Sequence, residues 1–257
     1  MERGVLHAVR YFMPGAPHGW RSRVLLDAAS SMGRISAARN PLPALLRSPA
    51  QLVSAVAYFS RTMTDTTARQ ELDSTVTAYR RTADVGVLLG KLEQIAHAHS
   101  TADLIVALEP HQQLQEVIGP VYEVIIEREP DNARALIALA QAYWLTGRGP
   151  DVVSGLAERA RAADPSYLAA WHMWALAESA PRERTERWRQ VVERFPDDPM
   201  SRVNLADSAA SLAGAEDDPV ALKLAVANYE HLLARATREE ERAALNHALK
   251  ALRSLLR

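Results

Sequence analysis

The chain has 257 residues, of which 48% are hydrophobic and 24% charged, a globular composition that allows one large domain or two small ones. It contains no cysteine, which excludes disulfides, iron–sulfur clusters, thiolate nucleophiles and cysteine-bound zinc. The net charge of −1 disfavours a nucleic-acid-binding protein. Because it has only 11 glycines and is rich in alanine, leucine and arginine, we expect a mostly helical, all-α protein. The composition without cysteine fits a reducing cytoplasm, so we expect a cytoplasmic protein, with membrane association as an alternative.

Residues 1–50 form a basic leader that five prolines interrupt. Seven arginines against Glu2 and Asp27 give it a charge of +5, which leaves −6 for the rest of the chain. Such asymmetry is typical of an interaction segment. An apolar ridge lies beside Arg3 and Arg10 in this leader, formed by Val5, Leu6, Val9, Phe12 and Met13. The ridge suits either packing onto the helical body or contact with an anionic membrane surface; we expect neither a signal peptide nor a membrane-spanning helix.

Residues 51–99 contain no proline and read as a helical hairpin. Apolar residues recur at helical spacing over Leu52–Phe59, and a second helix is predicted from Thr67, three residues before Gln70, as in a capping box. The apolar stripe of this second helix shifts face, which predicts a bend over residues 84–90. His97 and His99 end the helix, and a helical separation of two residues points them about 200° apart, which disfavours a shared metal.

Residues 100–257 contain a sequence period. Glu129-Pro130, Asp164-Pro165 and Phe195-Pro196 are separated by 35 and 31 residues, and nine residues after each proline comes a large residue followed by alanine. These pairs are Leu139-Ala140, Trp174-Ala175 and Leu205-Ala206. The pattern predicts repeated pairs of helices in which the alanine lets two backbones approach and the proline ends the second helix. We expect Asn132, Ser166 and Asp198 to cap the helices that follow.

With these residues in place, Thr101–Ala236 resembles the tetratricopeptide repeat (TPR) family, and the unit Ala133–Pro165 fits it best. The unit Leu168–Pro196 is shortened around Pro181, and the next carries an insertion over Gly214–Pro219. Pro110 and Pro120 are expected to interrupt the helices of the degenerate unit before them. The resemblance implies a solenoid of helical hairpins over 100–257, closed by a capping helix over 239–256 with a polar outer side.

The sequence contains no phosphate-binding glycine loop, dinucleotide fingerprint, two-histidine metalloprotease helix or serine nucleophile elbow. We therefore expect no cofactor, no metal and no enzyme activity; an enzyme with an unrecognised site over 51–130 is the less favoured alternative. The acidic pairs Asp197-Asp198 and Asp217-Asp218 precede prolines and are interpreted as helix caps. The Arg182–Arg189 stretch alternates arginines with glutamates, which favours a salt-bridged outer face over a basic patch.

The resemblance implies a scaffold, adaptor or assembly factor that binds another protein as a peptide or helix in the concave face of the solenoid. The groove residues it implies are Arg134, Ile137, Gln141, Trp144, Ala169, His172, Leu176, Val203 and Asp207, with Trp144 and Ile137 as apolar anchors. Ile137 and Gln141 stand where chaperone-tail binders of the family have lysine and asparagine, which disfavours that partner. The alternative is a peripheral-membrane or complex-bound accessory subunit that its basic leader anchors. Abundant arginine with lysine only at 91, 223 and 250 is typical of a GC-rich bacterial genome.

Overall fold

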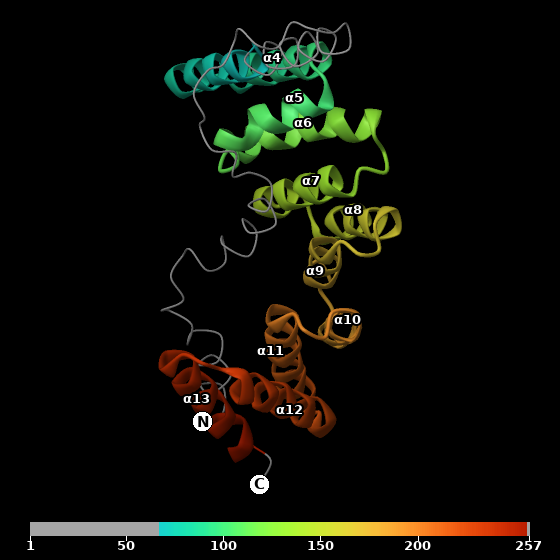
Figure 1. The fold of residues 1–257 in the computed structure, drawn as a ribbon, viewed down its shortest axis with the longest axis vertical. Helices are drawn as coiled ribbons and strands as arrows, with labels where there is room; N and C mark the ends of the chain where they lie inside the picture. The colour runs from blue at the N-terminus through green and yellow to red at the C-terminus, as the bar shows by residue number, and fades with distance from the viewer. Residues whose placement is uncertain (1–66, 256–257) are drawn as a thin grey trace, which may run out of the picture. The chain divides into compact units, whose positions relative to one another are not determined.

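The computed structural model describes residues 67–255, so the basic leader and the helix expected over Leu52–Phe59 lie outside the described residues. The described chain divides into two compact units, residues 67–164 and residues 165–255. In both units every regular element is a helix, as Figure 1 shows. The expected all-α fold built from helical hairpins is therefore confirmed for this part of the chain.

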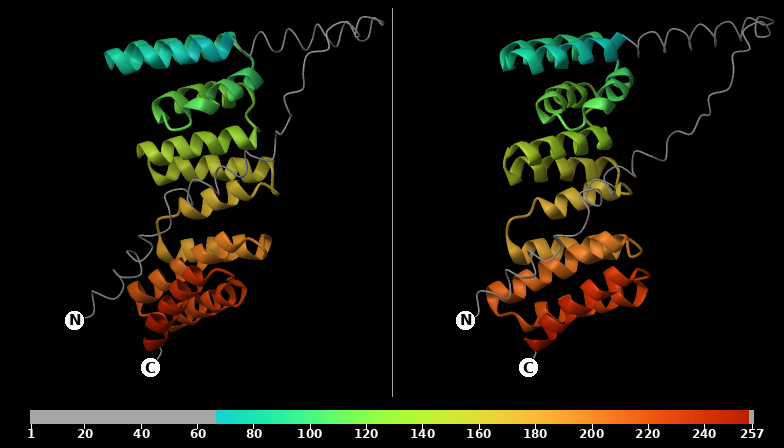
Figure 2. Two further views of the ribbon diagram at one scale, coloured as in Figure 1. Left: turned by 60° about the vertical axis from the view of Figure 1, so that its left-hand side comes forward. Right: turned by 90° about the vertical axis from the view of Figure 1, so that its left-hand side faces the viewer.

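The first unit begins with a helical segment over residues 67–82. It continues through α4 (Val85–Ala98), α5 (Thr101–Leu108), the 3-10 helix η1 (Glu109–His111), α6 (Gln115–Arg128), α7 (Ala133–Thr146) and α8 (Pro150–Ala163). Helix α6 packs between α4 and α7, and α7 packs on α8; Figure 2 shows these helices of the unit as successive layers. A buried apolar cluster joins the first layers, from Leu72 and Leu92 to Leu108 and Val121.

The bend predicted over residues 84–90 is a chain reversal instead. The helical segment ends at residue 82, Ala83 takes a left-handed conformation with φ 53°, and the Asp84 carboxylate accepts a hydrogen bond of 3.0 Å from the Val87 amide at the start of α4. At the far end of α4, His99 Nε2 lies 2.9 Å from Glu71 Oε2, so α4 runs back along the preceding segment. The face shift in the sequence therefore marks two antiparallel helices, each with its own buried stripe.

The two prolines of the degenerate unit behave differently from each other. Pro110 lies in η1, immediately after α5 ends, as expected. Pro120 lies inside α6, and the prediction that it interrupts the helix was wrong. It occupies the second turn, where it removes only the amide that would bond the Glu116 carbonyl, and burial of Val117, Val121 and Val124 along one side stabilises the continuous helix.

Helices α7 and α8 form the hairpin predicted for the best repeat. Leu139 is 1% exposed and Ala140 fully buried, the large-then-small pair that the register requires. Asn132 Oδ1 caps α7 by accepting from the Ala135 amide at 3.0 Å, and Gly147 ends it in the left-handed conformation with φ 74°. Pro150 starts α8 at a position where no amide is needed.

The second unit contains five helices in the described residues. They are α9 (Leu168–Leu176), α10 (Pro181–Arg194), α11 (Pro199–Glu216), α12 (Pro219–Arg235) and α13 (Glu239–Ser254). Each packs on the next, and prolines start α10, α11 and α12. The predicted insertion lengthens α11, which runs through Gly214 to Glu216. The cap position of α9 is Tyr167, one residue after the predicted Ser166, and α9 has no side-chain cap hydrogen bond.

The final helix, α13, lies within the range predicted for a terminal helix. Its buried stripe of Leu245, Leu249 and Leu252 joins a cluster with Leu222 and Tyr229 of α12. Glutamates 239–241 occupy its first turn, where the helix dipole stabilises negative charge. Among residues 67–255, no helix is both long and apolar enough to cross a membrane.

Candidate functional site

One face of α7 carries three of the residues that sequence reasoning assigned to partner binding. Arg134 and Gln141 are seven residues apart and therefore lie on the same side of the helix, and neither makes a side-chain hydrogen bond or ion pair within residues 67–255. Trp144 is 41% exposed and the adjacent Leu145 is 67% exposed. The opposite side of α7 is buried against α6 and α8, so its exposed side presents two large apolar residues beside two unpaired polar ones.

Ile137 does not belong to this exposed surface. It is only 1% exposed and is one of the largest fully buried side chains of the described residues. The seven-residue spacing of Ile137 and Trp144 predicted that both lie on one face of α7. Ile137 lies in the middle of the helix, where neighbouring helices cover it, whereas Trp144 lies in the last turn and stays exposed. Ile137 therefore stabilises the fold and is no apolar anchor for a partner.

In the second unit, His172 of α9 is held inside the fold. Its Nε2 lies 3.0 Å from Asp198 Oδ2 and 2.8 Å from Ser201 Oγ, and its ring packs against Trp188 at a centroid distance of 5.3 Å. A nucleophile triad needs the serine and the carboxylate on different ring nitrogens, whereas here one nitrogen faces both, and Ser201 is fully buried. The trio therefore joins α9 to the start of α11.

Asp198 is the centre of that connection. Its carboxylate accepts from the Ser201 amide at 2.7 Å, which confirms the predicted cap of α11. Burial raises the pKa of this carboxyl, but hydrogen bonds from His172 and Ser201 outweigh it and lower the pKa to about 2. The group is ionised at neutral pH and connects His172 of α9 to the start of α11.

The remaining predicted groove residues of this unit differ in their availability. Leu176 at the end of α9 is 39% exposed, and the predicted Ala169 is half-buried. Val203 packs against the cluster formed by α11, α12 and α13. The Asp207 carboxylate accepts a hydrogen bond from the Tyr229 hydroxyl, whose pKa is raised by burial and by this carboxylate. Of the large apolar groove residues predicted in this unit, Leu176 is therefore the exposed one.

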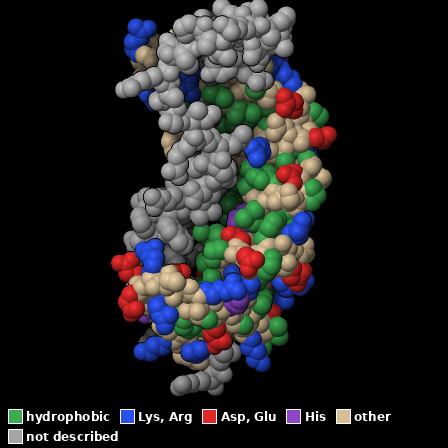
Figure 3. Space-filling view, viewed as in Figure 1, with side chains coloured by type: hydrophobic (Ala, Val, Ile, Leu, Met, Phe, Trp, Pro, Cys, Tyr) green, Lys and Arg blue, Asp and Glu red, His purple; other side chains and the backbone are tan. Residues whose placement is uncertain are grey.

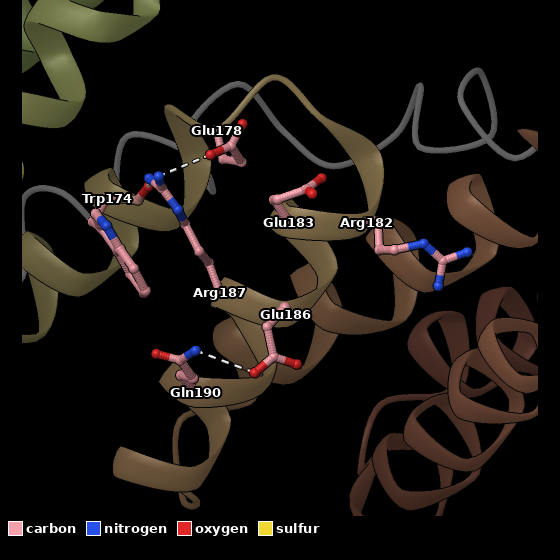
Figure 4. Close-up of a pocket in the computed structure, with 7 residues that line it drawn as sticks. All are labelled: Trp174, Glu178, Arg182, Glu183, Glu186, Arg187 and Gln190. Atoms are coloured by element: carbon pink, nitrogen blue, oxygen red, sulfur yellow. Dashed lines mark hydrogen bonds and ion pairs between the residues drawn. The ribbon is translucent and has the colours of Figure 1, made fainter.

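Sequence reasoning missed a pocket of 380 Å³ on the α9–α10 hairpin. As Figure 4 shows, Arg187 extends between Trp174 and Glu178, with its guanidinium carbon 4.7 Å from the Trp174 ring centroid and a 2.8 Å ion pair to Glu178. Arg182 points away from this pair and bonds Glu216 at 2.5 Å and Asp218 at 3.1 Å. Both guanidinium groups of the pocket are therefore already neutralised.

The arginines of α10 also complete the end of α9. Arg187 donates to the Trp174 carbonyl at 2.8 Å, and Arg184 donates to the Glu178 carbonyl at 2.5 Å. Glu178 accepts from the Ala180 amide, which with Arg187 holds the pKa of this carboxyl below its usual value despite some burial. Arg189 pairs with Glu186 at 2.6 Å. These pairs support the predicted salt-bridged surface, and charges of both signs are interspersed on the face seen in Figure 3.

A second, smaller pocket of 150 Å³ lies in the first unit, between α4, α6 and α7. The Tyr143 hydroxyl at its edge donates to Glu123 Oε1 at 2.5 Å, and Arg148 lies over the Tyr143 ring, 5.0 Å from its centroid. Burial and the Glu123 hydrogen bond raise the pKa of Tyr143 to about 12, so the phenol stays protonated. A Gly119-Pro120 step within a helical pattern was the only sequence signal for this pocket.

The two histidines at the end of α4 take part in contacts within the first unit. Arg128 donates to the His99 carbonyl at 2.9 Å and lies 3.4 Å from His97 Nδ1, while the His99 ring contacts Glu71. Within residues 67–255, no three His, Asp or Glu side chains gather in a way that would hold a metal ion.

The structure of this chain is similar to solved structures of other proteins. TTC0263, a TPR protein of Thermus thermophilus, shares 18% identity over 71% of this chain and 98% of its own, with a TM-score of 0.45. MamA of AMB-1 shares 17% identity over 63% of this chain and 97% of its own, with a TM-score of 0.41. No family model matches the sequence, and no curated protein matches it.

Proposed function

We propose that this chain is a non-catalytic interaction protein, a scaffold, adaptor or assembly factor, that binds another protein through the exposed side of α7. The observation that carries the proposal is the exposure of Trp144 and Leu145 on a helix that is otherwise packed on both flanks. Tryptophan and arginine are enriched where binding energy concentrates, and Trp144 and Leu145 are adjacent in the sequence and lie on the same helix as exposed Arg134.

The neighbouring polar residues support the same surface. Arg134 and Gln141 carry donors and acceptors that no residue of the described chain satisfies, so both can bond to a partner backbone or carboxylate. In this proposal Trp144 and Leu145 supply burial, while Arg134 and Gln141 select the partner. Because His172 is engaged by Asp198 and Ser201, the one histidine among the candidate residues serves the fold.

The test is affinity purification of the tagged full chain from its own cells, with co-purifying proteins identified by mass spectrometry. We expect a stoichiometric partner that the wild-type chain and a Val220→Ala control retain and that Trp144→Ala loses, because Val220 is 73% exposed on α12, in the other unit. A partner retained equally by Trp144→Ala, or the absence of any stoichiometric partner, would contradict the proposal.

A second proposal concerns residues 1–50, which lie outside the described residues. Their charge of +5 favours an anionic surface, either a membrane or a larger complex, for which the chain would be an accessory subunit. Flotation with anionic liposomes, with and without residues 1–50, distinguishes this from a partner protein. Flotation that depends on these residues supports the membrane alternative, and failure to float removes it.

A further inference from the structure

The pocket between α4, α6 and α7 has the form of a socket for a single side chain. Its apolar lining comes from three helices that are successive layers of one unit, with Leu89 on α4, Gly119 and Pro120 on α6, and Ala142 and Tyr143 on α7. Leu89 is 43% exposed, so part of its side chain is accessible to a ligand in the pocket. A space of 150 Å³ resembles in size an apolar protein cavity that takes one benzene ring, so the pocket can bury one aromatic or aliphatic side chain.

Small residues keep the socket open. Gly119 has no side chain, and a Cβ added there would meet no atom within 4 Å. Ala142 opposite it carries only a methyl group, and Pro120 presents an apolar ring without an amide donor. The position of Gly119 in α6 requires no positive φ, so its value at this site is the space that it leaves.

The charged residues around the socket indicate what flanks the bound side chain. Glu116 at the start of α6 is exposed and has no ion-pair partner within residues 67–255, and Glu123 binds only the Tyr143 hydroxyl there. Arg148 is stacked on the Tyr143 ring at the same edge. Two carboxylates and one guanidinium therefore line the socket, and this local excess of negative charge favours a cationic neighbour of the bound side chain.

We propose that this socket binds one apolar side chain of a partner protein segment whose neighbouring residues are lysine or arginine. The inference rests on the proposed interaction function and names the chemistry of the partner, at a pocket distinct from the Trp144 surface. The apolar group is buried against Leu89, Gly119 and Ala142, and the flanking cations lie near Glu116 and Glu123. Affinity comes mainly from burial, while the carboxylates select basic over acidic segments.

The test begins with a random 12-residue peptide library selected against the immobilised full chain. We expect recovered peptides to share one apolar residue with a lysine or arginine within three positions. Recovered peptides with acidic flanks, or recovery of no peptides, would overturn the proposal. Fluorescence anisotropy with one labelled recovered peptide then measures its affinity for the variants.

Gly119→Leu fills the socket from its floor, and Gly155→Leu is the matched control. Gly155 is an exposed glycine of α8, an added Cβ there also meets nothing within 4 Å, and both changes replace a helical glycine by a better helix former. We expect Gly119→Leu to weaken peptide binding at least tenfold and Gly155→Leu to leave it within twofold, with unchanged circular dichroism for both. Equal binding by the two variants would overturn the socket.

Glu116→Lys tests the selection of charge, with Glu127→Lys, an exposed glutamate elsewhere on α6, as its control. We expect about a five- to tenfold loss for Glu116→Lys and less than twofold for Glu127→Lys, the loss shrinking at high salt. Equal losses would contradict the role of Glu116. A synthetic peptide of residues 1–16 serves as competitor, and displacement by it would make the basic leader of this chain the occupant, overturning the commitment to a separate partner.

Failure here and failure of the proposed function have different signatures. If Trp144→Ala loses the cellular partner while Gly119→Leu retains both partner and peptide, the function stands and the socket is wrong. If a partner is recovered that neither variant affects, both the Trp144 surface and the socket are wrong, and if no partner is recovered, the interaction function itself is contradicted.

Discussion

The hairpins α7–α8 and α9–α10 follow one repeat pattern, but different contacts satisfy the ends of their first helices. Helix α7 has 14 residues, a side-chain cap at Asn132 and a left-handed Gly147 at its end, so its termini are satisfied locally. Helix α9 has 9 residues and no side-chain cap. Its last carbonyls accept from Arg187 and, beyond the helix, Arg184, while Trp171 donates to the Pro165 carbonyl at 3.0 Å. A repeat therefore tolerates a short first helix when the second helix supplies its missing caps.

The two hairpins also differ in the kind of side chain that forms their cores. The α7–α8 core is aliphatic, with leucines facing alanines. In α9–α10, buried Trp174 belongs to an aromatic group in which half-buried Trp171 lies edge-on to both Trp174 and Phe195 at 6.0 Å. Aromatic rings bury more area per residue, so fewer residues suffice for a short helix. The comparison predicts that α9–α10 depends more on individual side chains.

The largest expected effect is at Trp188, which is 3% exposed and contacts the His172 ring. Replacing it with alanine removes an aromatic core residue, and we expect Trp188→Ala to lower the free energy of unfolding by about 3–5 kcal/mol in urea titrations. Leu145→Ala, at a 67% exposed position, is the control and should change it by less than about 0.5 kcal/mol. Similar effects of the two substitutions would contradict the assignment of Trp188 to the core.

The two caps, Asp198 and Asn132, give the next contrast. Asn132 serves α7 alone, so Asn132→Ala should cost about 1 kcal/mol. Asp198→Ala removes the cap of α11 and the carboxylate that contacts both Ser201 and His172, and we expect about 2–4 kcal/mol. Thermal and urea unfolding measure both. Equal losses would show that the contact with His172 adds nothing to the cap.

Acid should diminish the contribution of Asp198. Its pKa is lowered from 3.8 to about 2 in the folded chain, so the stabilisation is complete above pH 3.8 and is lost as the pH falls through about 2. Asp198→Asn keeps a capping oxygen but cannot ionise. We expect the stability difference between wild type and Asp198→Asn to shrink by about 2 kcal/mol between pH 5 and pH 2. A difference that stays constant over this range would refute the lowered pKa.

A smaller effect separates the arginines of α10. Arg187 is mostly buried, pairs with Glu178 and bonds the Trp174 carbonyl, so Arg187→Gln should cost about 1–2 kcal/mol. Arg189 pairs with Glu186 on the surface, and Arg189→Gln should cost less than about 0.5 kcal/mol. Urea midpoints compare the two. Equal costs would mean that Arg187 is only a surface ion pair and that α9 does not need its carbonyl partner.

Local signals explain which elements were predictable. The proline spacing and the large-alanine pairs predicted helix pairs that the structure has at 133–163 and 199–235, and Asn132 and Asp198 cap where expected. Pro120 failed as a breaker because packing of α6 overrode the local preference, and the cap position of α9 is Tyr167 instead of Ser166. The reversal at Ala83 was missed, since neither glycine nor proline marks it.

Residue types and their spacing were sufficient to determine that this chain is helical, that helix pairs recur after residue 130, and that Asn132 and Asp198 cap helices, because each of these depends on periodicity and capping within a short stretch. Only the tertiary structure decided that Ile137 is buried while Trp144 remains exposed, that His172 is bound by Asp198, and that Gly119 faces an open socket. Those outcomes depend on which neighbouring helix covers a given face, and helical spacing alone carries no information about the neighbour.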